Sequence, residues 1–499
     1  MKNRSTKTTS LLLVLLLALS FTACSDLSNS SSQTSSATQA ATIAETASTK
    51  PPYETVKSNL TLNEQGLADN IDDGAILHAW CWSFNTIKEN LKSIADSGFS
   101  AIQTSPISEC KIGENGGLQI GDTDTSRNNG KWYYHYQPIS FKIGNYQLGT
   151  EEEFKAMCSE AHKYGIKIIV DVIPNHMTGD RGAISKDVKN LKDPFHSGGS
   201  INDWNDRKQV TQGDLLGLAD LNTQNPVIQE AVLDYLKRCV EDGADGFRYD
   251  AAKHIELDSD DPAFASEFWE VVTKNGSKFQ YGEILQGGAD RVDAYATKLN
   301  LAASNYGENI RQVIMNSDLS AAIIENYNIS NIDPSKLVTW VESHDNYCND
   351  GSWEQLTEDD VKHGWAIITA RKGGTPLFYS RPMGSSTDNQ WGNNEIGKAG
   401  SNAYKDKTVV EINKFRNAMI GLDEEISNPH DIENVLMIER GTKGVVIVSV
   451  LNTTLNLHDV TTKLEDGTYK DKISGDTFTV KNGEFADGTV EENQIIVLY

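Results

Sequence analysis

The stretch from Gly243 to His254 reads GADGFRYDAAKH, and it has the pattern of a buried β-strand that ends in charged residues. Arg248 and Asp250 are two residues apart, so their side chains project from the same face of such a strand. A guanidinium beside a carboxylate keeps the carboxylate ionised at neutral pH, which a nucleophile requires. The same pattern also fits a buried structural ion pair. Other segments of the sequence are needed to distinguish between these two interpretations.

Short β-rich segments alternate with amphipathic helical segments from about residue 69 onward. The helical segments carry apolar residues every three or four positions, and several end in glycine, as helices with one buried face do. Strands that are each followed by a helix predict an α/β fold, the (β/α)8 TIM barrel. We expect its eight strands at 75–80, 100–106, 167–176, 243–250, 279–285, 302–307, 337–345 and 375–382, with helices such as 86–98, 151–165, 227–243 and 359–373.

Two regions depart from a minimal barrel. After the third strand, residues 177–215 are polar, and a connection of that length is usually functional or a small subdomain. After a last helix near 406–421, strands follow one another through turn-like segments without helices between them. We therefore expect the barrel over 69–176 and 216–422, an insertion domain over 177–215, and a C-terminal antiparallel β-sandwich domain over 423–499.

The first 24 residues have the pattern of a lipoprotein-type signal peptide. A basic start precedes the apolar run 11–19, which is too short to span a membrane. The run leads to FTAC, so we expect a lipid anchor at Cys24 after cleavage; an ordinary signal peptide cut near Ala23 is the alternative. Residues 25–68 are rich in Ser, Thr and Ala and predict a disordered tether. The protein is therefore expected to be extracellular or held at the cell surface.

The composition limits the kinds of partner. The formal net charge is −25, and so acidic a chain repels phosphate backbones, which excludes nucleic acid and fits a neutral substrate. The six cysteines are widely spaced without a CxxC pair, so neither a disulfide framework nor a zinc site is indicated. Cys158 and Cys239 lie on apolar faces of predicted helices, as buried thiols do. We expect a monomer whose only membrane contact is the lipid anchor.

Three carboxylates, Asp250, Glu283 and Asp345, fall at the ends of different predicted barrel strands. Barrels of this kind place their working residues at those ends. Glycoside hydrolysis needs one ionised carboxylate and one protonated carboxylic acid. Asp250 beside Arg248 fits the ionised group, and Glu283, which emerges from an apolar strand, fits the acid. A surface group or a helix cap is the alternative for each carboxylate taken alone.

Four segments together resemble the hallmark regions of the α-amylase family, glycoside hydrolase family 13. They are DVIPNH (171–176), GFRYDAAKH (246–254), YGEIL (281–285) and VESHD (341–345), and GLADLN (217–222) is similar to an additional region. The resemblance is closest to secreted bacterial α-amylases with a short insertion domain. It implies endo-hydrolysis of α-1,4-glucosidic bonds in starch, glycogen and maltodextrins, with retention by double displacement. Asp250 would be the nucleophile, Glu283 the acid and base, and Asp345 the stabiliser of the oxocarbenium-like transition state.

The resemblance also implies substrate contacts and a calcium ion. The substrate contacts would come from Tyr136, Gln137, His176, Arg248, Lys253, His254 and His344. Calcium would bind the side chains of Asn175 and Asp220 and backbone carbonyls near Thr211 and at His254, oxygen ligands that suit Ca²⁺. A helix-proximal cap is the alternative for Asp220. Ser343 stands where chloride-binding members have Asn, so no chloride requirement is expected.

Two other functions stay open at this point. A transglycosylase or an exo-acting relative would use the same chemistry, because the shape of the sugar subsites decides whether water or a sugar is the acceptor. A glucan-binding surface protein without activity would be built on the same scaffold. The presence of all three carboxylates argues against that second function.

Overall fold

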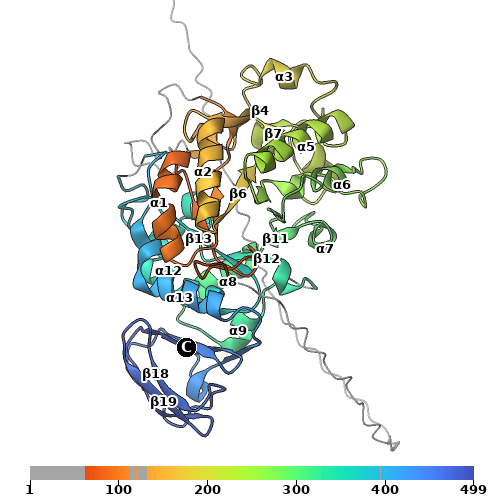
Figure 1. Cartoon of the computed structure of the whole chain (residues 1–499). Coiled ribbons are helices and arrows are strands. Elements are labelled where there is room, and N and C mark those ends of the chain that lie inside the picture. The colour runs from red at the N-terminus through yellow and green to blue at the C-terminus, as the bar shows by residue number, and fades with distance from the viewer. Residues whose placement is uncertain (1–61, 113–117, 119, 121–131, 330, 394) are drawn as a thin grey trace, which may run out of the picture. The chain divides into compact units, whose positions relative to one another are not determined.

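A computed structural model describes residues 62–112, 118, 120, 132–329, 331–393 and 395–499. Its centre is a closed barrel of parallel strands in the order β1, β2, β6, β9, β10, β11, β12 and β13, with β13 paired to β1 (Figure 1). The strands are β1 (Ile76–Ala79), β2 (Ala101–Thr104), β6 (Lys167–Val172), β9 (Gly246–Tyr249), β10 (Phe279–Gly282), β11 (Asn300–Ala302), β12 (Leu337–Trp340) and β13 (Thr375–Tyr379). The predicted TIM barrel is confirmed.

The sixth barrel strand lies earlier in the chain than predicted. Strand β11 covers residues 300–302, whereas the sequence suggested 302–307, and helix α8 begins at Ser304. A strand of three residues has too few positions to show an alternating pattern. The other barrel strands lie inside their predicted segments.

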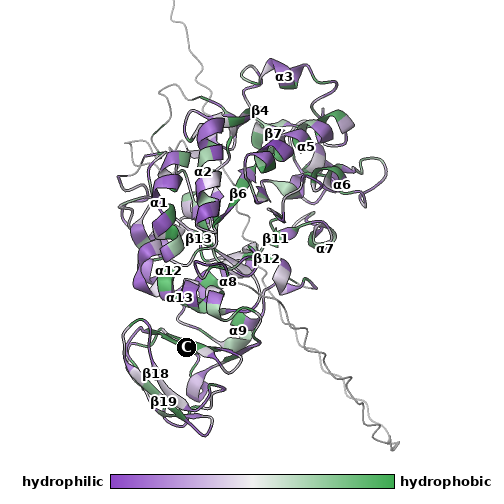
Figure 2. Ribbon diagram, in the orientation of Figure 1, coloured by the Kyte–Doolittle hydropathy of each residue, from purple (hydrophilic) through white to green (hydrophobic). Residues whose placement is uncertain are grey.

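Helices follow the barrel strands, and their starts are encoded locally. Thr150 and Thr357 each form a capping box, with Glu153 and Asp360 respectively, at the first turns of α2 and α12. Figure 2 shows many hydrophilic residues along α2, whereas strand β6 is hydrophobic. The helices are α1 (Phe84–Asp96), α2 (Glu151–Lys163), α5 (Pro226–Glu241), α6 (Phe268–Val272), α7 (Val292–Tyr295), α8 (Ser304–Met315), α9 (Ala321–Glu325), α10 (His344–Cys348), α11 (Ser352–Gln355), α12 (Glu358–Ala370) and α13 (Lys407–Ala418).

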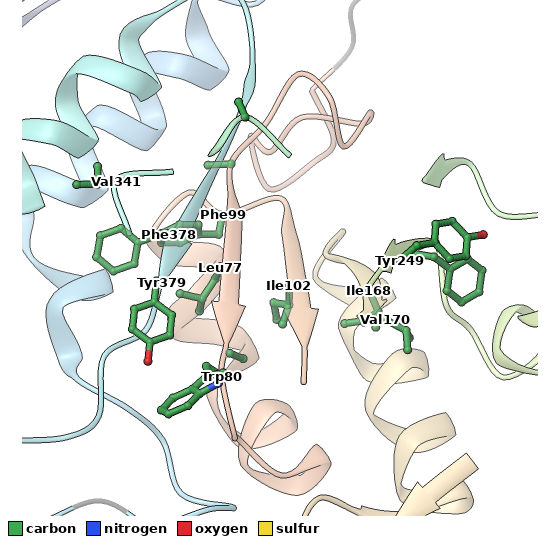
Figure 3. Packing of buried hydrophobic residues seen from close by; sticks show 14 of the residues in the cluster. Leu77, Trp80, Phe99, Ile102, Ile168, Val170, Tyr249, Val341, Phe378 and Tyr379 are labelled. Atoms are coloured by element: carbon green, nitrogen blue, oxygen red, sulfur yellow. The ribbon is translucent and has the colours of Figure 1, made fainter. Parts of the chain in front are cut away.

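Alternating strand residues build two apolar layers. Ile76, Ala101 and Ile169 belong to a cluster contributed by strands around the barrel, as expected for its interior. Their neighbours Leu77 and Ile102 belong to a second cluster, which also contains buried residues of the surrounding helices (Figure 3). This packing fixes the strand ends that carry the candidate site.

Two extra pieces of structure lie beside those strand ends. The predicted insertion, 177–215, contains α3 (Lys186–Lys189) and α4 (Arg207–Gln212), and its two ends are brought together where β7 (His176–Met177) pairs with β8 (Ala219–Asp220). The connection after β2 forms an antiparallel sheet of β3 (Ser108–Cys110), β4 (Pro138–Asn145) and β5 (Gly149–Thr150), which the sequence did not suggest. The two pieces contact each other, since Thr178 N donates to the Pro138 carbonyl at 2.9 Å.

The C-terminal region consists of antiparallel sheets, as predicted. One sheet has the order β14 (Glu424–Ser427), β15 (Val435–Arg440), β16 (Gly444–Ser449) and β22 (Ile495–Leu498). The others pair β17 (Leu455–Asn456) with β21 (Thr489–Val490), and β18 (Gly467–Lys470), β19 (Thr477–Lys481) and β20 (Glu484–Asp487) in that order. A separate apolar cluster, which includes Val445, Phe478 and Phe485, lies within this region.

The predicted tether ends earlier than residue 68. Leu67 and Ala68 are buried, and the Asn63 side chain accepts from Leu67 N at 2.9 Å, so residues 62–68 belong to the packed part of the chain. The predicted signal peptide and Cys24 lie outside the described residues. Cys158 and Cys239 are buried free thiols, as predicted. Within the described ranges, none of the helices has the length and apolar character needed to cross a membrane.

Candidate active site

The carboxyl ends of four barrel strands bring the predicted catalytic residues to one edge of the barrel. Strand β6 carries Asp171, β9 carries Arg248 and leads to Asp250, β10 leads to Glu283, and β12 leads to His344 and Asp345. Because the strands are parallel, all these positions lie at the same edge. The three carboxylates proposed from the sequence therefore belong to one site.

Arg248 lies at the centre of this site and is shared by three carboxylates. Its Nη1 is 2.8 Å from Asp171 Oδ1 and 3.0 Å from Asp250 Oδ1, and its Nη2 is 2.9 Å from Glu283 Oε1. The exposed fraction of the side chain rises from 6% for Arg248 to 12% for Asp250, 15% for Glu283 and 36% for Asp345. The carboxylates thus lead from the buried arginine toward solvent.

The shared arginine does not neutralise the whole cluster. Burial raises the pKa of Asp171 to about 6 in spite of Arg248. Burial, and then repulsion from Glu283, raises the pKa values of Asp250 and Asp345 well above the usual range. The expectation that Arg248 keeps Asp250 ionised is therefore too simple, because one positive charge serves several carboxylates.

A left-handed turn at Ala251 points its backbone N–H at the Glu283 side chain. Ala251 has φ 48° and ψ 30°, a conformation that is unfavourable for a residue with a Cβ atom. Its N–H donates to Glu283 Oε2 at 2.9 Å. The turn directly after Asp250 therefore connects the two carboxylates that the sequence assigned to nucleophile and acid.

Tyr136 lies against the site from the unpredicted antiparallel sheet region. Its hydroxyl donates to Asp171 Oδ2 at 2.9 Å, and its ring stacks on His344 with centroids 5.1 Å apart and an interplanar angle of 12°. His344 is buried, and its Nε2 is 3.4 Å from Asp345 Oδ2. Gln137 is half-buried and accepts a hydrogen bond from Thr178 at 3.0 Å. Tyr136 and His344 thus form one wall of the site.

Three further predicted substrate residues flank the carboxylates. His176 Nε2 is 3.2 Å from the carbonyl of Tyr136, and burial lowers its pKa to about 4. Lys253 Nζ donates to the carbonyls of Leu285 and Gly287, and Lys253 N donates to the Glu283 carbonyl. Burial likewise lowers the pKa of His254 to about 4, so both histidines are neutral near pH 7.

The predicted calcium residues form two neighbouring pairs. Asn175 and Asp220 meet through the β7–β8 pair, since Leu221 N donates to the Asn175 carbonyl at 2.9 Å. Thr211 lies on α4, whose Val210 carbonyl is 2.8 Å from His254 Nδ1. No cluster of three or more His, Cys, Asp or Glu side chains that could hold a metal was found among the described residues. A metal ion here would depend on amide and carbonyl oxygens as well.

The charge at Asp220 is compatible with a cation. This carboxylate is 1% exposed, and burial followed by repulsion from Asp214 raises its pKa well above the usual value. Asp214 accepts two hydrogen bonds from Arg181, and its Oδ1 accepts from Asp220 N at 3.2 Å. His196 Nδ1 lies 2.7 Å from Asp220 Oδ2. Buried carboxylate oxygen beside an Asn amide fits a hard cation such as Ca²⁺.

Sequence reasoning missed some residues of this region. Asp171 stands in the quoted DVIPNH segment, but only the structure shows that it binds both Arg248 and Tyr136. Asp214 and His196 lie in the polar insertion, where one charged residue is not distinguishable from another by pattern. The single signal for Asp171 was its position near the end of a predicted strand.

Two family models and several curated relatives match this chain. The family model of the α-amylase catalytic domain matches residues 82–363, and that of the bacterial α-amylase C-terminal domain matches residues 428–490. An α-amylase of Butyrivibrio fibrisolvens is 43% identical over 472 residues, which cover 86% of this chain and 47% of the relative. An α-amylase of Clostridium acetobutylicum is 39% identical over 447 residues, which cover 87% and 55%. The chain thus spans about half the length of these curated relatives.

A solved structure shows the same fold. The α-amylase I of Eisenia fetida, solved in complex with maltohexaose, is similar with a TM-score of 0.68 at 20% identity, covering 87% of this chain and 97% of that chain. The catalytic-domain match spans more than half of the present chain. The chain therefore belongs to the α-amylase family, glycoside hydrolase family 13.

Proposed function

We propose that this protein is an endo-acting α-amylase, which hydrolyses α-1,4-glucosidic bonds in starch, glycogen and maltodextrins with retention of configuration. The observation that carries the proposal is the convergence of Asp250, Glu283 and Asp345 on one barrel edge around Arg248. Membership of the α-amylase family supports the same substrate class. The neutral substrate also suits a chain with a formal net charge of −25.

The reaction proceeds in two displacements. Asp250 attacks the anomeric carbon while Glu283 gives its proton to the glycosidic oxygen, so the C–O bond to the leaving sugar breaks and a β-glucosyl ester forms. Glu283 then takes a proton from water, whose oxygen attacks the same carbon and releases Asp250. Asp345 stabilises the positive charge that develops at the anomeric carbon. Two inversions give an α-anomeric product.

The surrounding residues bind and orient the sugar. Tyr136 offers an aromatic face, Arg248 and His344 are the donors at the cleavage point, and His176 is a further contact there. Lys253 and His254 are the contacts on the leaving-group side, and Gln137 is a polar contact beside Tyr136. Donors that contact the sugar more tightly as charge develops lower the barrier instead of only strengthening binding.

We further propose a calcium ion held by Asn175, Asp220, the carbonyl of His254 and a carbonyl near Thr211. When bound, such an ion supplies positive charge that offsets the buried carboxylate of Asp220. The residues themselves connect β7, β8 and α4 with the turn after β9, so they stabilise the arrangement of the site.

We propose that the enzyme works without chloride. Arg381 is buried, and its Nε lies 2.7 Å from Glu342 Oε2. Ser343 uses its hydroxyl to cap α10 by accepting from Asn346 N. A carboxylate of the chain itself therefore supplies the negative charge beside Arg381.

The cellular location of the protein is also a proposal. The sequence pattern of residues 1–24 supports export and a lipid anchor at Cys24, which would hold the enzyme outside the cell at the surface. We also propose that the protein is a monomer.

The test is proton NMR of residues 62–499 with maltoheptaose, with Asp250→Asn in parallel. We expect rapid appearance of α-anomeric short maltooligosaccharides with the wild type and loss of turnover by several orders of magnitude in the variant. Initial β-anomers would exclude retention. Products longer than the substrate would identify a transglycosylase, and amylose binding without turnover would identify a glucan-binding protein.

A further inference from the structure

Arg207 is the first residue of α4, and its side chain is buried where the insertion packs against the barrel. Its side chain is 12% exposed, and its partner Asp260 is 1% exposed. Nε lies 3.2 and 3.1 Å from the two oxygens of Asp260, and Nη2 donates to Oδ2 at 3.0 Å. Nη2 also donates to the Tyr295 hydroxyl at 2.7 Å. Two parallel contacts to one carboxylate fix the plane of the guanidinium.

The same guanidinium binds carbonyl groups of the catalytic edge. Nη1 donates to the Lys253 carbonyl at 2.8 Å and to the Ala289 carbonyl at 3.3 Å, and Nη2 donates to the Ile255 carbonyl at 3.2 Å. Lys253 and Ile255 are the neighbours of His254. Arg207 therefore holds the backbone on both sides of His254 and the loop that follows Glu283.

Helix α4 also fixes the His254 ring. His254 Nδ1 is 2.8 Å from the Val210 carbonyl, which can only accept, so Nδ1 carries the proton and Nε2 is the acceptor in the neutral ring. Lys253 is held in turn, since its Nζ donates to the carbonyls of Leu285 and Gly287 at 3.1 and 2.9 Å. His254 is thus oriented from the insertion, whereas the Lys253 side chain is held by the loop after β10, whose Ala289 carbonyl accepts a hydrogen bond from Arg207.

We propose that Arg207 is a positioning residue for the leaving-group side of the cleft. It acts through Lys253 and His254, whose orientation depends on the docking of α4 by the Arg207–Asp260 pair. The inference rests on the proposed function, because Lys253 and His254 contact sugar only in a glucan-binding enzyme. Arg207 itself does not touch the substrate.

The geometry requires arginine at this position. A planar guanidinium offers five N–H donors in fixed directions, and here they contact a carboxylate, a hydroxyl and three carbonyls. A lysine keeps the charge beside Asp260 but has three donors on one atom and cannot reach all of these groups. Arg207→Lys therefore preserves the ion pair and loses the backbone contacts.

Two substrates distinguish a positioning role of Arg207 from a general effect of its substitution on stability. Maltoheptaose places glucosyl units against Lys253 and His254, whereas an aryl α-maltotrioside has a leaving group without sugar. For Arg207→Lys we expect kcat/KM on maltoheptaose to fall about tenfold or more, mainly through KM, with a shifted cleavage position. Hydrolysis of the aryl maltotrioside stays unchanged. Equal losses on both substrates, or no loss on either, would overturn the proposal.

Arg371→Lys is the matched control. Arg371 is also buried and contacts one carboxylate, Glu424 at 2.9 Å, one tyrosine hydroxyl, Tyr306 at 2.9 Å, and the Ile324 carbonyl at 2.6 Å, but it lies outside the catalytic edge. This variant should lower the melting temperature without changing the ratio of the two activities. Asp260→Asn should shift the ratio in the same direction as Arg207→Lys.

The results of these experiments distinguish failure of the positioning role from failure of the proposed function. A wild type that cleaves neither substrate contradicts the proposed function. A wild type that cleaves both, with an unchanged activity ratio in Arg207→Lys and Asp260→Asn, contradicts only the positioning role.

Discussion

Arg248 shows how a single residue organises the chemistry of this protein. Its guanidinium contacts Asp171, Asp250 and Glu283, which come from three adjacent barrel strands. Removing it would leave buried carboxylates without a cation, a change that is far more costly than loss of one surface ion pair. The same contacts hold the three carboxylates beside one another, so the arginine affects both the stability and the geometry of the site.

His135 provides a residue-scale prediction about pH. It is fully buried, and burial lowers its pKa to about 3. Below pH ~6.5 the unfolded chain binds a proton at this ring that the folded protein does not, so this contribution to stability is complete above pH 6.5 and falls toward pH 3. In His135→Phe, the free energy of unfolding relative to wild type should rise by up to about 1.4 kcal/mol per pH unit as pH falls below 6.5.

Urea unfolding at several pH values measures this difference, and His162→Phe is a control of opposite sign. His162 is partly exposed, and its hydrogen bond with Asp245 raises its pKa, so its contribution is present at low pH and is lost as pH rises. A pH-independent difference for His135→Phe would contradict the prediction.

The insertion is the element that connects the residues proposed to bind calcium with the candidate site. The β7–β8 pair holds Asn175 and Asp220, and α4 holds His254. Ion binding to the folded state stabilises it by about 2.7 kcal/mol at a concentration one hundred times the Kd. Removal of calcium with a chelator should therefore lower both the melting temperature and the activity, and added Ca²⁺ should restore them.

Calorimetric calcium titration of wild type and Asp220→Asn gives a readout that does not depend on turnover. The variant keeps the shape of the side chain but loses its charge, so we expect weaker calcium binding and a smaller effect of the chelator. A melting curve of the wild type that the chelator leaves unchanged would rule out the metal assignment.

On the largest scale, the C-terminal sheet shares an apolar cluster with the helices around the barrel. Leu436, Ile438 and Val446 belong to the same apolar cluster as the barrel helices, and Arg440 donates to the carbonyls of Ala370 and Met419. Shared burial of this kind couples the stability of two regions. We expect residues 62–499 to unfold in one calorimetric transition, with calorimetric and van't Hoff enthalpies equal. Two resolved transitions would show that the sheets fold independently.

Much of the fold could be read from local periodicity. The strand around Arg248 and the helices around residues 151–163 follow patterns of two and of three to four residues, which depend only on neighbours in the chain. The short strand 300–302 was misplaced, and the sheet of β3, β4 and β5 was missed, because their pairing partners are not encoded in a local pattern.

Local periodicity was enough to predict the barrel, and the four hallmark segments were enough to propose Asp250, Glu283 and Asp345 as catalytic carboxylates, because both signals lie in short stretches of neighbouring residues. Tertiary structure alone decided which groups share Arg248 and how Arg207 holds the turn around His254. Asp171 and Arg248 are 77 residues apart, and Arg207 and Lys253 are 46 apart. Such contacts arise when separate elements pack together, and the pattern of side chains within one element does not predict them.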